Sequence, residues 1–399
     1  MATLTTLTEL QVIALSEARQ EPSWLLERRL EAYKAFVDLE WPDNRVEEWR
    51  YTDPRRLDLT RPLVDGGDIA AQAPAQGVVI SDLATAARTH EAVVRDALGS
   101  AVDLGRKFAA GNLAAFTEGL FVHVPAEVEL DEPIRVTVEA AADGALLPRV
   151  LVVLGAHAKA TVLLDHVGDA DATVVEVVEA VLREGARLHL VTTQHWGPRV
   201  DHLGAHTGRV GANADYRHFE ATLGGKTVYL TPDVELAEPG GNAELLGVYL
   251  TDDGRHVEHR SLIHHDASNT TSDSIYKGAL QGDSFASWYG NIRIERHAKA
   301  TASDETNRNL ILGAGARASS IPFLEILCSD VVRCGHHSSV GQMDELQLFY
   351  LESRGIPREA AVRMLVFGFF KEVTDRVGVP AVADGVLAEL SRAIEGSYP

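Results

Sequence analysis

The sequence has few cysteines and no long apolar run, and both shortages exclude classes of protein. Only Cys328 and Cys334 occur among the 399 residues, so the chain is neither a disulfide scaffold nor a closed four-thiolate zinc site. No stretch of about 18 unbroken apolar residues is present to span a bilayer. The first twenty residues lack the basic start and apolar core of a secretory signal. We therefore expect a protein of a reducing, cytoplasmic compartment.

Positive charge is also scarce. Lys and Arg number 37 against 58 Asp and Glu, which gives a net charge of -21. A field of that sign repels phosphate backbones, so nucleic acid and anionic membranes are poor partners. Apolar residues at 45% and charged residues at 24% are typical of a globular chain. The length of the chain suggests two or three domains, unless a single elongated domain accommodates all of its residues.

The first part of the sequence has helical texture. Pro22 and Ser23 are suited to begin a helix, and Trp24 adds an aromatic anchor. The apolar stripe expected on that helix consists of Leu26, Leu30, Tyr33 and Val37. A second helix is expected from Ser81 to about Leu98, with residues 64–77 between the two as a surface connection.

From about Gly119 the sequence changes to short alternating apolar runs separated by Gly, Asp and Pro, which indicates strands. Similar short phrases recur mostly at about 25 to 30 residues, beginning at Gly155, Gly185, Gly211, Gly240, His297 and Gly313. A turn Gly, then Ala, then alternating residues at that period suits a β-solenoid, since each coil buries its inner face only against the next. An antiparallel sandwich with repeated turns fits the pattern equally.

Helical texture returns after His337. Asp344 with Gln347 resembles a capping box, and Gly355 with Pro357 indicates the end of one helix and the start of the next. The second helix carries one apolar face, which consists of Val362, Leu365, Val366, Phe369, Val373 and Val377. Met364 and Phe367 project to its opposite side, so either two layers of the protein clasp them or they dock a partner.

The segment from Ser319 to Val373 resembles the closing region of the SufB/SufD family of iron-sulfur cluster assembly scaffolds. Its parts are SIPFLEI, SVGQMD, LFYLESRGI and GFFKEV, which together are more specific than a short catalytic motif. EEWRYTD from Glu47 and NLAAFTEGLFVHVP from Asn112 also match the family. The resemblance implies a mainly β fold, with a helical domain at 1–116, a right-handed parallel β-helix at 117–340, and a C-terminal helical domain at 341–399. It thereby favours the solenoid.

Within that family the sequence looks like the SufD branch. SufB-like chains carry core cysteines implicated in receiving sulfur, whereas no cysteine precedes Cys328 here. The resemblance implies a non-catalytic scaffold that pairs with SufB through the β-helix core and binds the SufC ATPase through its C-terminal helices. The residues expected to contact SufC are Phe349, Tyr350, Leu351, Arg354, Gly355, Ile356, Met364 and Phe367.

Cys334 and His336 align where the resemblance implies a Cys and a His facing SufB. Residues two apart on a strand share a face, so these two side chains point together and His337 points away. Thiolate and imidazole suit iron or an iron-sulfur species. The pair leaves the nascent cluster or iron half-coordinated, so SufB is expected to supply the other ligands. Without the family context, a buried thiol and a hydrogen-bonded histidine explain the same residues.

The other cysteine and the clustered histidines give weaker indications of a metal site. Cys328 lies without a neighbouring histidine and is expected in the core. His264 and His265 form a pair near His256 and His259, which chance explains among 16 histidines. Whether iron enters through this subunit, whether flavin binds, and whether the isolated chain forms a homodimer are left open.

Other functions have weaker support. GGKT at Gly224 resembles the end of a phosphate loop, but Glu220 stands where that loop needs Gly and a strand is expected from Val228. A SufB-like paralogue is the nearest alternative, and an interaction module without a metal role is another. A carbohydrate-active β-solenoid enzyme would need close carboxylates, for which the candidates are Asp273, Asp283 and Asp304.

Overall fold

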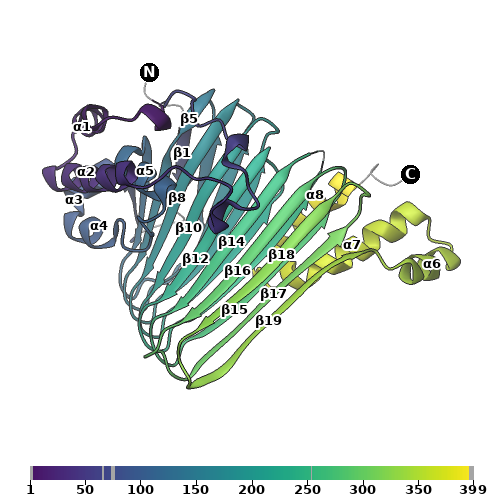
Figure 1. Cartoon of the computed structure of the whole chain (residues 1–399). Helices are drawn as coiled ribbons and strands as arrows, with labels where there is room; N and C mark the ends of the chain where they lie inside the picture. The colour runs from purple at the N-terminus through teal and green to yellow at the C-terminus, as the bar shows by residue number, and fades with distance from the viewer. Residues whose placement is uncertain (1–2, 65–66, 73–76, 253, 395–399) are drawn as a thin grey trace.

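The computed structural model describes residues 3–64, 67–72, 77–252 and 254–394. Short helices come first, two long sheets fill the middle, and three helices end the described part of the chain (Figure 1). The elements that precede the long sheets are η1 (Leu4–Thr6), α1 (Glu9–Ala18), α2 (Ser23–Asp38), η2 (Glu47–Trp49), η3 (Pro54–Arg56), β1 (Gly67–Gln72), β2 (Val79–Asp82), α3 (Leu83–Thr89), α4 (Glu91–Ala97) and α5 (Lys107–Ala115).

The middle of the chain is a parallel β-solenoid, which confirms the predicted architecture. The first sheet continues from β1 through β4 (Ile134–Ala140), β7 (Lys159–Gly168), β9 (Arg187–Trp196), β11 (Asp215–Thr222), β13 (Asn242–Thr251), β15 (Thr271–Leu280), β17 (Thr301–Ile311) and β19 (Val331–Gln342). The second continues from β2 through β3 (Glu118–Val124), β6 (Pro148–Leu154), β8 (Ala172–Leu182), β10 (Asp201–Val210), β12 (Thr227–Leu236), β14 (His256–His265), β16 (Phe285–Ile294) and β18 (Arg317–Ile326), with β5 (Gly144–Leu146) beside β8.

Each coil adds one strand to each sheet. Asp201 pairs with Thr227 and Phe285 pairs with Arg317, so the described coils take from 26 (227 − 201) to 32 (317 − 285) residues. The strands pair in parallel, apart from the antiparallel pairs β1–β4 and β2–β3 at the start of the described sheets. Side chains between the two sheets therefore stack coil upon coil.

One corner of the solenoid explains the recurring phrases in the sequence. Where the chain passes from the second sheet to the first, one residue per coil has positive φ, as at His157, Gly185, Asn213, Gly240 and Asn269. The backbone N–H of each donates to a carbonyl of the next coil, at 2.8 to 3.3 Å. Gly and Asn adopt this conformation at least cost. The phrase from Gly313 is the exception, because it lies on the opposite corner, between β17 and β18.

The interior changes character along the solenoid. Its early coils hold aliphatic residues such as Val136, Val152 and Leu164, whereas the later coils bury Tyr216, Tyr249, Tyr276 and Trp288. Glycines leave room for these rings. A Cβ on Gly278 would lie 2.0 Å from Tyr249 Cε2, and one on Gly247 would lie 2.2 Å from Tyr276 Cδ1.

Helices α1 to α5 cover the outer face of the second sheet, where they share an apolar cluster with Leu151, Val175 and Leu203. The predicted stripe on α2 is partly wrong. The helix buries the positions Trp24, Leu25, Arg29, Ala32 and Phe36, while Val37 is 55% exposed. The cause is Arg29, whose buried guanidinium pairs with Glu21 at 2.7 Å and lies over the Phe116 ring.

Two expectations for the segment before the solenoid are also corrected. The helix expected from Ser81 to Leu98 is two helices, α3 and α4, which are separated at His90, and Ser81 belongs to β2. Residues 67–72 of the expected surface connection form β1, which pairs with β4. Residues 65–66 and 73–76 of that connection lie outside the described residues.

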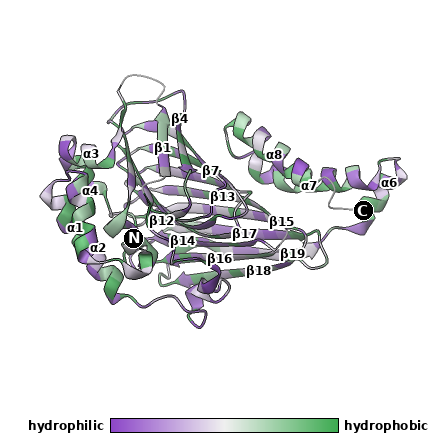
Figure 2. Cartoon of the chain, turned by 90° about the horizontal axis from the view of Figure 1, so that it is seen from above, coloured by the Kyte–Doolittle hydropathy of each residue, from purple (hydrophilic) through white to green (hydrophobic). Residues whose placement is uncertain are grey.

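The chain ends in α6 (Glu345–Ser353), α7 (Arg358–Thr374) and α8 (Pro380–Ile394). Of the predicted capping box, the Asp344 N-cap is found, which accepts from the Leu346 N–H at 2.8 Å. Gly355 has a positive φ of 85°, and Pro357 is the N-cap residue of α7. These helices share an apolar cluster with outward residues of the first sheet, such as Phe219 and Leu246. Figure 2 shows them on a different side of the solenoid from the N-terminal helices.

Lys277 of β15 fixes α7 to the first sheet. Its ammonium donates to the Phe369 carbonyl at 2.7 Å and pairs with Glu372 at 2.5 Å. Among the described residues, none of the helices combines the length and apolar character needed to cross a membrane.

Replacing an interior glycine tests the packing of the solenoid. Gly278→Ala places a methyl group against the Tyr249 ring, so we expect a loss of about 1–3 kcal/mol in the free energy of unfolding, measured by urea denaturation. Gly341→Ala on β19 is the matched control, because a Cβ there meets nothing within 4 Å. Equal stabilities of the two variants would show that Tyr249 moves aside freely.

Candidate functional site

The last coil of the solenoid is an edge on both sheets. β19 pairs with β17 on one side and β18 pairs with β16, and among the described strands none occupies the other side of either. This coil also exposes large apolar side chains, which are Phe323 (47%), Ile326 (43%), Leu327 (41%), Val332 (72%) and Val340 (47%). A free strand edge with apolar side chains is a surface that another chain can cover.

Cys334 and His336 lie in the middle of that edge strand and on the same face of it. Cys334 is registered with Ser303 and His336 with Glu305, both buried on β17. The two side chains thus continue the interior face of the solenoid. His337 is registered with Thr306 and shares the outer face of β19 with Arg333, which pairs with Asp304 at 2.5 Å. The alternation expected from the sequence is the one observed.

Glu305 belongs beside this pair, and the sequence reasoning missed it. Its carboxylate reaches across the interior, since a Cβ on Gly290 of the opposite sheet would lie 2.4 Å from Glu305 Oε2. Burial raises the pKa of Glu305 to about 8, against an opposing hydrogen bond from the Phe323 backbone. A period-two reading of β17 would have placed Glu305 inward, but its register with His336 is a contact between coils that the sequence does not reveal.

The protonation state of Cys334 differs from the thiolate expected from the sequence. Burial, followed by the charges of Glu305 and Asp304, raises the pKa of the Cys334 thiol to about 11. The thiol is therefore protonated near neutral pH in the isolated chain. Coordination of iron requires the thiolate, so a cation has to approach this face before Cys334 can bind.

The other cysteine and the four histidines noted in the sequence are placed apart from this pair. Cys328 is buried in the solenoid core, as expected. His265 faces the hydroxyls of Thr270 and Ser272, whereas His264 pairs with Glu295. His256 contacts Thr52 and His259 lies near Glu220. His256, His259, His264 and His265 therefore do not meet at one point.

A different set of histidines does converge, and no sequence pattern indicated it. His166, Glu176, His202 and His206 place one ligand atom each within 4.8 Å of the others, inside the solenoid. His218 and Glu220 extend the group from His206. All six side chains are buried. They come from four strands of both sheets, so only the coil register brings them together.

The C-terminal helices expose an apolar surface. Phe349 (68%), Tyr350 (56%), Met364 (53%) and Phe367 (45%) are exposed together with Arg354 and Gly355, while Leu351 and Ile356 are half-buried. Leu346 (77%), absent from the predicted set, joins them. The exposure of Met364 and Phe367 shows that no other layer formed by the described residues clasps them.

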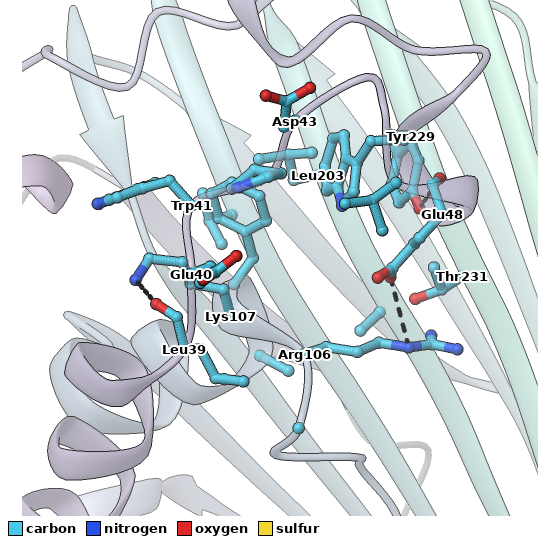
Figure 3. A pocket seen from close by; sticks show the side chains of 18 of the residues that line it. Leu39, Glu40, Trp41, Asp43, Glu48, Arg106, Lys107, Leu203, Tyr229 and Thr231 are labelled. Atoms are coloured by element: carbon cyan, nitrogen blue, oxygen red, sulfur yellow. Dashed lines mark hydrogen bonds and ion pairs between the residues drawn. The ribbon is translucent and has the colours of Figure 1, made fainter.

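A cavity of about 490 Å³ lies between the N-terminal segment and the outer face of the second sheet (Figure 3). Trp49 stacks on Tyr229 with centroids 4.4 Å apart, so the EEWRYTD segment is anchored on the solenoid here. Arg106 pairs with Asp233 at 2.7 Å, and the Lys107 ammonium donates to two backbone carbonyls. Both cations thus have partners in the protein, and the aromatic residues that line the cavity are Trp41, Trp49, Phe108 and Tyr229.

The strand positions also decide two alternatives raised by the sequence, a phosphate loop at GGKT and a carbohydrate site at three aspartates. Val228 to Leu230, after the GGKT sequence, belongs to β12, so a helix of the kind that follows a phosphate loop does not form there. Asp273 and Asp304 are registered neighbours, yet each pairs with its own arginine, Arg376 and Arg333. Asp283 is exposed at a corner of the solenoid. These contacts favour no carbohydrate site.

Comparison with known proteins identifies relatives along most of the chain. The family model described as "SUF system FeS cluster assembly, SufBD core domain" matches residues 136–369. An iron-sulfur cluster assembly SufBD family protein of Mycobacterium tuberculosis is 37% identical over 367 residues, which cover 89% of this chain and 90% of that protein. The corresponding protein of Mycobacterium leprae is 36% identical over 366 residues, at 89% and 91% coverage.

A more distant relative carries a more specific name. The iron-sulfur cluster assembly protein SufD of Bacillus subtilis is 27% identical over 396 residues, which cover 94% of this chain and 85% of that protein.

Alkylation of Cys334 tests the effect of Glu305. With a pKa of about 11, about one Cys334 thiol in a hundred is ionised at pH 9, where Glu305 is itself charged because its pKa is about 8. Glu305→Gln removes that charge, so we expect iodoacetamide to modify Cys334 several-fold faster at pH 9, as measured by peptide mass spectrometry. Glu325→Gln on β18 is the matched control. The same rate in all three proteins would contradict the assigned coupling.

Proposed function

We propose, because this chain belongs to the SufBD family of iron-sulfur cluster assembly proteins, that it is a SufD-like scaffold subunit. It pairs with a SufB-like chain through the last coil of the solenoid and holds a SufC-like ATPase on its C-terminal helices. Cys334 and His336 offer ligands to a nascent cluster, or to iron, between the two scaffold chains. The cluster is cargo, assembled there and passed on. In this proposal the chain comprises an N-terminal helical domain at 1–116, the β-helix core at 117–340 and the ATPase-binding helical domain at 341–399.

The observation that supports pairing is the coincidence of three features on the last coil. β19 has a free edge, the last coil exposes apolar side chains, and Cys334 and His336 face the same open end. One thiol and one imidazole leave metal coordination incomplete. A second chain that covers the edge supplies the missing ligands and, with its bound iron, the positive charge that Cys334 needs to lose its proton.

The SufD assignment, in place of a SufB-like one, rests on the absence of cysteine before Cys328. Coils that carry no thiol cannot accept persulfide sulfur, and this holds for every coil before Cys328. The relative named SufD in Bacillus subtilis aligns over most of the chain. We therefore infer that sulfur arrives through the partner and that the compartment is the cytoplasm.

Attachment of the ATPase is supported by the exposed surface of α6 and α7. Two shallow apolar hollows lie there, one beside Leu346, Tyr350 and Leu365 and the other beside Met364 and Phe367. Apolar anchors in such hollows carry most of the free energy of protein binding. Because Lys277 ties α7 to β15, a movement of the bound ATPase would be transmitted to the solenoid.

Co-purification tests the proposed assembly. We expect the tagged chain, co-expressed with the SufB-like and SufC-like proteins of the same organism, to retain both. The double variant Met364→Glu, Phe367→Glu should retain the SufB-like chain and bind the ATPase at least about tenfold more weakly, as measured by titration calorimetry. Leu10→Glu on α1, where Leu10 is 77% exposed, is the control. A wild-type chain that captures neither protein, and forms only homodimers, would refute the proposal.

A comparison of alanine variants at His336 and at the adjacent His337 tests whether His336 is a ligand. In the complex, His336→Ala should lower the yield of reconstituted cluster several-fold without dissociating the chains, because the imidazole faces the shared site. His337→Ala, on the opposite face of β19, should leave the yield within about twofold. The yield is followed by visible absorbance and by iron and sulfide content. Equal yields from the two variants would remove His336 from the site.

A further inference from the structure

We propose that the solenoid holds a divalent transition-metal ion at His166, Glu176, His202 and His206, far along the chain from Cys334. His166 lies on β7 of the first sheet, Glu176 on β8 of the second, and His202 and His206 on β10 beside it. Glu176 is registered with Gly204, midway between the two β10 histidines. This resident ion is independent of the proposed function, which concerns a transient cargo on the last coil.

The four side chains converge on one point. Glu176 Oε2 lies 2.8 Å from His166 Nε2, 3.1 Å from His206 Nε2 and 3.3 Å from His202 Nε2. Ligand atoms about 2.0–2.1 Å from a tetrahedral metal stand about 3.3 Å from each other. The three separations between the carboxylate and the imidazoles are therefore close to those in a coordination shell, and all four ligand atoms lie within 4.8 Å of one another, so a small outward movement of the rings opens a three-histidine, one-carboxylate site.

The hydrogen-bond donors and acceptors of His166 and Glu176 show why a cation fits between them. His166 Nδ1 lies 3.3 Å from the Thr193 carbonyl oxygen, which can only accept, so Nδ1 carries the proton. In a neutral ring Nε2 then presents a lone pair to the Glu176 oxygen, which is also an acceptor. A metal ion between them satisfies both. A histidine oriented through its other nitrogen by a backbone carbonyl is the usual arrangement around metals.

The remaining polar atoms agree with this assignment. Glu176 Oε1 has no hydrogen-bond partner among the described residues, and it is wholly buried. A second buried carboxylate stands just outside the shell, where Glu220 Oε2 lies 3.5 Å from the second nitrogen of His206 without a hydrogen bond between them. With neutral imidazoles, the two buried carboxylates and one divalent ion sum to zero charge, which reduces the cost of burying them.

The backbone leaves room for the shell at Gly204. A Cβ at this residue would lie 2.5 Å from Leu230 Cδ2 and 3.1 Å from His202 Nε2. Trp196 closes another side, with its ring centroid 5.4 Å from that of His166 and 5.7 Å from that of His202. Three imidazoles and one carboxylate suit Zn²⁺, Fe²⁺ or Co²⁺ better than Mg²⁺ or Ca²⁺. The absence of thiolate from the shell distinguishes it from the site on the last coil.

Cobalt binding to the full-length chain tests this site. Because the residues are buried, the chain is unfolded in denaturant with chelator, and refolded with and without Co²⁺. We expect about one equivalent of Co²⁺ to remain after gel filtration, with the d–d absorption of a four- or five-coordinate ion and a raised midpoint of thermal unfolding. The variants His202→Gln and His206→Gln should lose the absorption and at least about tenfold in affinity.

A matched control and a direct localisation complete the test. His265→Gln changes an equally buried histidine that faces two hydroxyls, so it should bind Co²⁺ as the wild type does. If the His202 and His206 variants do not fold, anomalous difference density from crystals of the Co²⁺-loaded wild type locates the ion. Refolded wild type that retains no Co²⁺, or density away from Glu176, would overturn the proposal and leave a proton-linked hydrogen-bond network in its place.

Discussion

Parallel pairing of coil on coil is the constraint on which the rest of this structure depends. Each coil can bury its inner face and satisfy its backbone only against the next coil, so the stack must end somewhere with an open edge. At the start, the antiparallel strands β1 and β2 end the two sheets. At the other end the chain leaves β19 for helices that fold onto the outer face of the first sheet. None of the described strands covers the last coil, which is why its edge and its apolar side chains are accessible to a second chain.

The repeats in the sequence fitted this stack and an antiparallel sandwich equally, and the family resemblance decided for the stack; the repeats arise because the corner has a strict conformational requirement. A residue with positive φ is needed once per coil, and Gly185, Asn213 and Gly240 meet it at little cost. The helical segment was harder to predict, because Arg29 is buried through an ion pair with Glu21. A count of apolar residues cannot include a charged side chain whose partner lies off the helix. The pairing of β1 with β4 depends equally on a distant strand.

The candidate sites differ in the same way: part of each site follows from residues close in the sequence, and the rest depends on strands that are far apart in it. The shared face of Cys334 and His336 follows from spacing on one strand, which the sequence contains. The position of Glu305 opposite His336, and its effect on the Cys334 thiol, depend on how β17 is registered with β19. The buried cluster of His166, Glu176, His202, His206, His218 and Glu220 depends on four strands, two in each sheet. A site whose side chains come from several coils therefore cannot be predicted from any single segment, even where the fold itself is predicted correctly.

The polar interior is the feature that stability alone explains least. Coils that hold Val136, Val152 and Leu164 show that aliphatic side chains fill this space well. Removing an ionised carboxylate from water costs several kcal/mol even after relaxation, and Glu176 and Glu220 are buried, while the burial of Glu305 raises its pKa to about 8. Apolar residues of similar volume would stabilise the same coils. Buried carboxylates that lie beside imidazole or thiol groups, such as Glu176 inside the solenoid and Glu305 at its open end, are thus positions where binding of a cation would recover the electrostatic cost.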